Sequence, residues 1–112
     1  MATIAPPKPD VEDFPKTKVA ATLLAELLYV AKAEAQVRGI ALPTEEPKII
    51  QAPIPMDSLS VVDTLCTLET VVGFELRDSI VRTGGYNSIE AAMEHLIPRI
   101  ERAWVHKKGS KK

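Results

Sequence analysis

The sequence predicts a small all-α bundle of three main helices and one short helix, with a long loop between the first and second main helices. Apolar residues recur at helical spacing near residues 16–38, 58–72 and 87–104. Four prolines fall within residues 39–57, which excludes a long helix or an interior strand there. The chain has 112 residues, 46% of them apolar, which suits a single core.

The first helix is expected over residues 16–38, a segment rich in strong helix formers. Gly39 follows directly, as a helix stop should. Residues 1–15 hold four of the nine prolines and are expected to be a flexible lead-in. The apolar positions that set the helical spacing are Val19, Leu23, Leu27 and Val30.

The second main helix is expected over residues 58–72, after a loop that spans 39–57 and places Ile49 and Ile50 in the core. Its apolar arc is broad, which predicts a central helix and a buried, structural Cys66. Glu69 falls within the arc by angle, either exposed at its edge or contacting a partner. The arc consists of Leu59, Val61, Val62, Leu65, Cys66, Leu68 and Val72, opposite Ser60, Asp63, Thr64, Thr67 and Thr70.

A turn, a short helical piece near residues 78–82 and a second turn lead to the last helix. That helix is expected to begin at Asn87 or Ser88, and Asn87 and Glu90 have the form of a capping box. Pro98 is expected to interrupt or kink it. The expected divisions of the chain are a lead-in over 1–15, a helical domain over 16–104 with Trp104 in its core, and a basic flexible tail over 105–112.

Composition excludes several classes of protein. The net charge of −1 argues against a general nucleic-acid binder. No apolar run approaches the ~20 residues of a membrane span. The single cysteine and the lack of a signal pattern favour a reducing, cytoplasmic location. No metal-site spacing and no set of nucleophile, base and orienting residue is visible, so we do not expect an enzyme.

The segment IPMDSLSVVDTLCTLETVVGFEL, residues 54–76, places Asp57 and Ser58 at the start of the second main helix. Both residue types are preferred N-caps, so either could be a cap and nothing more. Ser60 and Asp63 offer a second capping box. Alternatively, the hydroxyl of Ser58 is held out for attachment of another group. The residues alone leave both interpretations open.

This segment resembles the prosthetic-group site of the acyl carrier protein family, small helical bundles with Asp-Ser-Leu at the start of their second helix. The apolar rhythm of the helix that follows is similar to the family's second helix. NSIEAAMEHLIPRI, residues 87–100, is similar to its last helix. The resemblance covers about residues 49–100 and predicts an acyl-carrier-like bundle.

The resemblance implies that Ser58, flanked by Asp57 and Leu59, carries 4′-phosphopantetheine delivered from coenzyme A by a phosphopantetheinyl transferase. The thiol of this arm would hold an acyl or aminoacyl group as a thioester. Acyl-loading or acyl-transferring enzymes of fatty acid or secondary metabolite biosynthesis would be its partners. Residues 49–76 contain four acidic and no basic residues, which suits basic patches on such enzymes. The residues expected to contact these partners are Val62, Asp63 and Glu69.

The chain also departs from the family pattern. Pro55 stands where the family usually has glycine, and Ser60 stands where it usually has an acidic residue. Gly84 and Gly85 look like a small insertion. These differences predict a specialised or divergent carrier. The alternative is an unmodified, carrier-like protein–protein interaction module in which Ser58 serves as a cap.

Overall fold

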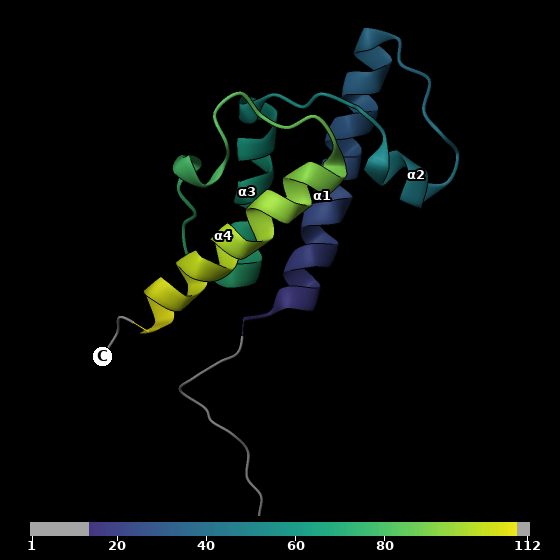
Figure 1. Cartoon of the computed structure of the whole chain (residues 1–112). Helices are drawn as coiled ribbons and strands as arrows, with labels where there is room; N and C mark the ends of the chain where they lie inside the picture. The colour runs from purple at the N-terminus through teal and green to yellow at the C-terminus, as the bar shows by residue number, and fades with distance from the viewer. Residues whose placement is uncertain (1–13, 110–112) are drawn as a thin grey trace, which may run out of the picture.

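The computed structural model describes residues 14–109, which form an all-α bundle, as the sequence predicts. The helices α1, α3 and α4 pack together, with α4 lying across α1 and with α2 and η1 at the edges (Figure 1). None of the helices in this part of the chain is long and apolar enough to cross a membrane. The helices are α1 (Lys16–Arg38), α2 (Glu46–Gln51), α3 (Ser58–Val72), the 3-10 helix η1 (Asp78–Ile80) and α4 (Ile89–Gly109).

Helix α1 has the bounds that the sequence predicts. It ends at Gly39, whose backbone is left-handed at φ +72° and whose N–H reaches the carbonyls of the last turn. The lead-in expected before α1 lies, up to residue 13, outside the described residues. The buried face of α1 is one row of residues four apart, namely Val19, Leu23, Leu27, Ala31 and Ala35.

The loop predicted over residues 39–57 is interrupted by helix α2, so the prediction of an unbroken loop is wrong. Pro47 lies in the first turn of α2, where the missing N–H of proline costs no helical hydrogen bond. Ile49 is buried and Ile50 is half-buried against the core, which confirms their predicted role. The short helix thus brings both isoleucines to the core despite the density of prolines.

Helix α3 also has its predicted bounds, but its buried face is narrower than expected and is turned toward Thr64. Thr64 is buried because its hydroxyl donates a 2.7 Å hydrogen bond to the carbonyl of Val61. Cys66 is exposed, so its predicted burial is wrong. Leu59, which the sequence also places on the apolar arc, is 77% exposed. The buried residues of α3 are Val61, Thr64, Leu65, Leu68 and Val72.

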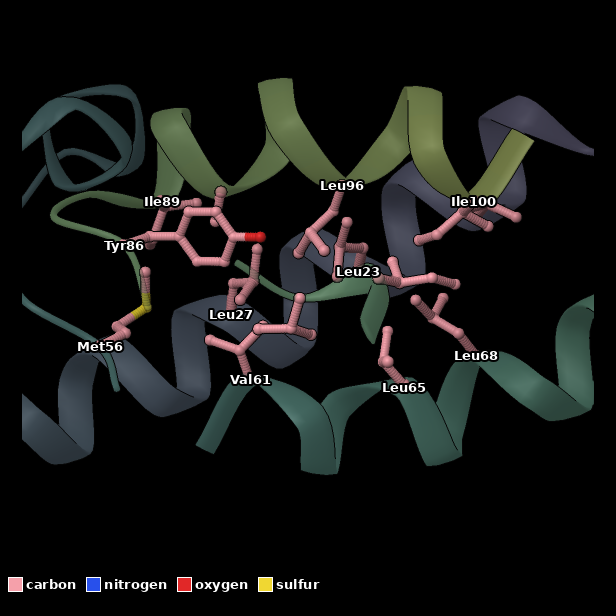
Figure 2. Packing of buried hydrophobic residues seen from close by; sticks show 14 of the residues in the cluster. Leu23, Leu27, Met56, Val61, Leu65, Leu68, Tyr86, Ile89, Leu96 and Ile100 are labelled. Atoms are coloured by element: carbon pink, nitrogen blue, oxygen red, sulfur yellow. The ribbon is translucent and has the colours of Figure 1, made fainter. Parts of the chain in front are cut away.

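The core fills the space between α1, α3 and α4. Figure 2 shows the buried side chains of α3 pointing toward those of α4, with Leu23 and Leu27 of α1 beside them. The core is almost entirely aliphatic, and a fully buried leucine of this kind contributes about 1.5–3 kcal/mol. The side chains labelled in Figure 2 are Leu23, Leu27, Met56, Val61, Leu65, Leu68, Tyr86, Ile89, Leu96 and Ile100.

Helix α4 begins with a different cap from the one expected. The hydroxyl of Ser88 accepts a 3.0 Å hydrogen bond from the N–H of Ala91, three residues on. The cap is therefore Ser88, and the capping box expected from Asn87 and Glu90 is not the observed arrangement. The short helical piece expected near residues 78–82 is the 3-10 helix η1 and is only three residues long.

Pro98 lies on an exposed part of α4, and the helix continues through it to Gly109. Leu96 and Ile100, on either side of this proline, are fully buried and hold both halves against the core. The tail predicted from residue 105 therefore begins within the helix; residues 110–112 lie outside the described part. Trp104 is buried, as predicted.

Candidate functional site

Ser58 is the first residue of α3, and Asp57 before it is the N-cap. Asp57 has an extended backbone, and its Oδ1 accepts a 2.8 Å hydrogen bond from the N–H of Ser60. Ser60 therefore lies within the first turn, and the alternative capping box with Asp63 is not the one that closes this helix end. The structure thus assigns the capping role to the aspartate.

The carboxylate of Asp57 is stabilised as an anion at the helix N-terminus. The hydrogen bond from the backbone of Ser60 is the main cause that lowers the pKa of Asp57. The positive end of the helix dipole favours the same ionised form. A phosphate attached to Ser58 would therefore lie beside an existing negative charge, and cationic groups of a partner would have to balance both.

The hydroxyl of Ser58 is not used by the fold. The residue is half-buried, and within residues 14–109 its Oγ has no hydrogen-bond partner. A cap serine would instead accept from an N–H of the first turn, as Ser88 does at the start of α4. The described residues also contain no group of three or more potential metal ligands.

The loop that precedes Ser58 is fixed by an isolated antiparallel bridge. The N–H of Met56 donates to the carbonyl of Tyr86 at 2.8 Å, and the N–H of Tyr86 donates back at 2.9 Å. Gly85 packs directly on this bridge with φ +84°. A Cβ at Gly85 would overlap the carbonyl oxygen of Met56 and lie 2.9 Å from the backbone of Asp57. Gly85 thus shapes the approach to Ser58.

Tyr86 also ties this bridge to α4 through a polar network that the sequence does not reveal. Its buried hydroxyl accepts from the N–H of Arg82 at 3.0 Å and lies 2.6 Å from Nδ1 of His95. When the imidazole is neutral and carries its proton on Nε2, this hydroxyl donates its own hydrogen bond to Nδ1. Burial, and then the charges of Arg99 and Arg82, lower the pKa of His95 and favour that form. The guanidinium of Arg82 covers the tyrosine ring at 4.8 Å.

The exposed side of α3 beside Ser58 carries an apolar strip, formed by Leu59, Val62 and Cys66. Leu59 is 77% exposed, Val62 is half-buried and Cys66 is exposed. Asp63, also exposed, lies next to the strip. Two of the three residues expected to contact partners, Val62 and Asp63, therefore share a surface with Leu59.

Glu69, the third residue expected to contact a partner, has a structural role. It is half-buried, and its Oε2 accepts a 2.9 Å hydrogen bond from the N–H of Leu76. This contact fastens the segment after α3 back onto the helix. The carboxylate of Glu69 is therefore engaged within the fold, whereas the side chain of Asp63 is exposed.

Comparisons with protein-family models, with curated proteins and with solved structures find no match to this chain. The candidate site is defined by its own geometry. It consists of a serine hydroxyl that bonds to no residue in the described part of the chain, the aspartate that caps the helix, and an exposed apolar strip on α3.

Proposed function

We propose that this chain is a non-catalytic carrier of acyl or aminoacyl groups, with 4′-phosphopantetheine attached to Ser58. The observation that carries this proposal is the hydroxyl of Ser58, which stands at the start of α3 without a hydrogen-bond partner among residues 14–109 while Asp57 caps the helix. An attachment residue needs such a free hydroxyl, whereas a capping serine does not leave one. The resemblance of residues 54–76 to the acyl carrier protein family supports the same site.

The surroundings of Ser58 fit the arm. Oγ of Ser58 would attack the β-phosphate of coenzyme A, forming a phosphodiester and releasing adenosine 3′,5′-bisphosphate. The transferase would accept the hydroxyl proton, since the carrier supplies no base. The bridge between Met56 and Tyr86 holds the preceding loop in place, so the hydroxyl is presented on a fixed backbone.

The strip of Leu59, Val62 and Cys66 supplies a contact surface for the transferase and for acyl-loading or acyl-transferring enzymes. The exposed leucine beside Ser58 offers apolar area that a partner can bury within an otherwise polar contact. Asp57 and Asp63, both exposed, add the negative charge that basic patches on such enzymes would meet. We place this function in the cytoplasm, where a lone exposed thiol stays reduced.

Intact mass spectrometry tests the proposal. The full chain is incubated with coenzyme A, magnesium and a broad-specificity phosphopantetheinyl transferase, and we expect the gain of one phosphopantetheine group. Ser58→Ala should abolish the gain. Ser60→Ala is the matched control, because it removes a hydroxyl two residues away, and it should be modified normally.

Two results contradict the proposal. The first is a wild-type chain that stays unmodified although a known carrier is fully converted in the same mixture. The second is an adduct that persists in Ser58→Ala. The first result favours the alternative function, an unmodified interaction module that binds partners through the exposed strip of α3. The second result shows that the arm is attached at a residue other than Ser58.

A further inference from the structure

A cleft of about 710 Å³ lies between the segment that follows α3 and the last three turns of α4. A volume of this size matches the clefts that hold small ligands. Phe74 begins one wall just beyond the C-terminal end of α3, whereas Ser58 is at the opposite end of that helix. The lining residues are Phe74, Glu75, Leu76, Arg77, Ser79, Ile80, Arg99, Arg102, Ala103, His106 and Lys107.

The lining combines an apolar part with a strongly cationic part. Four cationic side chains line the cleft against the single carboxylate of Glu75, and His106 adds an imidazole. Clustered charges of one sign at a low-dielectric wall attract ions of the other sign. The apolar lining residues are Phe74, Leu76, Ile80 and Ala103, and the cationic ones are Arg77, Arg99, Arg102 and Lys107.

The two walls are fastened to each other, so the cleft is preformed. Arg99 on α4 donates from Nε to the carbonyl of Ile80 at 2.9 Å and from its terminal nitrogen to the carbonyl of Ser79 at 3.0 Å. Glu69 accepts from the N–H of Leu76 and fixes the first part of the same wall. A preformed site loses less entropy when a ligand binds.

Arg77 and Arg102 remain available to a ligand. Both side chains are exposed, and within residues 14–109 neither is paired with a carboxylate. Arginine presents a planar fork of donors that matches the paired oxygens of a phosphate or a carboxylate. Two such forks beside an apolar wall suit a ligand that has an anionic head and an apolar body.

We propose that this cleft binds an organic anion, a phosphate ester or a carboxylate on an apolar body. Arg77 and Arg102 hold the anionic head, and the apolar lining residues contact the body. This site is separate from Ser58, because α3 has 15 residues and its two ends are about 22 Å apart. The proposal goes beyond carrier function and does not require that Ser58 be modified.

Trp104 provides a direct readout. It is the single tryptophan of the chain, it is buried, and its ring lies 6.3 Å from that of Phe74 in the cleft wall. The unmodified full chain is titrated with decyl phosphate, decanoate, inorganic phosphate and decanol, each below its micelle or solubility limit. We expect saturable changes in tryptophan fluorescence with decyl phosphate or decanoate. The anion that binds with the lower dissociation constant identifies the preferred head group. Inorganic phosphate and decanol should bind at least about tenfold more weakly.

Variants test which residues hold the anion. Arg77→Gln and Arg102→Gln should each weaken binding about tenfold, a typical loss for a charge-assisted hydrogen bond. Arg38→Gln is the matched control: it removes the same charge from α1, where Arg38 pairs with Glu34, and should change affinity less than twofold. Ser58→Ala should bind as the wild type does, which separates this site from the proposed attachment site.

Three results would overturn the inference. These are the absence of saturable binding by both amphiphilic anions, equal affinity for decanol and for the more tightly bound anion, and an unchanged affinity for that anion in the Arg77→Gln/Arg102→Gln double variant. Thermal unfolding of each variant verifies that the bundle is intact, as expected for substitutions of exposed side chains.

Discussion

Gly85→Ala probes the packing that shapes the approach to Ser58. Gly85 has φ +84°, and a Cβ would overlap the carbonyl oxygen of Met56. A left-handed backbone costs an L-residue about 1–2 kcal/mol. The overlap must also displace the Met56–Tyr86 bridge, whose two hydrogen bonds contribute about 0.5–1.5 kcal/mol each. We expect Gly85→Ala to lower the free energy of unfolding by about 2–5 kcal/mol in total.

Gly84→Ala is the matched control for this effect. Gly84 has φ +91°, but a methyl group on its α-carbon would meet no atom within 4 Å, so this variant carries the conformational cost alone. Its expected loss is about 1–2 kcal/mol. Urea unfolding followed by circular dichroism measures both losses, and a difference of about 2 kcal/mol separates the midpoints by about 1–2 M. Equal midpoints for the two variants would refute the close approach of Gly85 to Met56.

Three further predictions concern the cap of α3, the contact between Tyr86 and His95, and the contact between Glu69 and Leu76. Asp57→Ala should cost about 1 kcal/mol of stability, whereas Ser58→Ala should cost a few tenths at most, because the serine hydroxyl makes no hydrogen bond within residues 14–109. Equal losses in urea unfolding would contradict the assignment of the cap. The folded-state pKa of His95 lies below the unfolded value of 6.5, so its contribution to stability is complete above pH 6.5 and is lost as pH falls toward the folded pKa. Tyr86→Phe should make that loss smaller between pH 7 and 5, and an identical pH profile would argue against the hydrogen bond. Glu69→Ala should destabilise the chain by about 1–3 kcal/mol, because it leaves the N–H of Leu76 without its acceptor. A loss of stability below the error of the urea measurement would count against that contact.

Helices with strong local signals could be predicted from the sequence. The bounds of α1 and α3 follow from a run of helix formers, an aspartate cap and glycine stops, all of which act within a few residues. Helix α2 could not be predicted by counting prolines, because Pro47 occupies the one part of a helix that tolerates it. The position of Pro47 in the first turn of α2, and not the number of prolines nearby, therefore determines whether a helix can form in this segment.

The buried face of α3 shows a second limit. Cys66 is apolar enough for the core but is exposed, whereas Thr64 is polar and buried. Thr64 satisfies its hydroxyl within its own helix, so burial leaves no unpaired group. A prediction from the hydrophobicity of each residue type therefore assigned Cys66 and Thr64 to the wrong faces of α3.

The candidate site was partly predictable for a related reason. Asp57 and Ser58 are adjacent in sequence, and their place at a helix start follows from local signals. The contact of Gly85 with Met56 and the hydrogen bond between Tyr86 and His95 depend on how distant segments meet. No local pattern encodes such partners, and the same holds for Arg77 and Arg102, which the fold alone brings to one cleft.

The aromatic contacts at the far end of α3 have a consequence for how this domain can be joined to other structures. The ring of Phe14, just before α1, meets Trp104 near the end of α4 at 5.9 Å, and Phe74 lies against the same tryptophan. Phe14 and Trp104 therefore both lie near the C-terminal end of α3, about 22 Å from Ser58 at its other end. A bulky fusion, a solid support or a neighbouring domain joined before Phe14 or after α4 would lie toward the opposite end of α3 from Ser58. Such an attachment would leave the surface around the serine accessible.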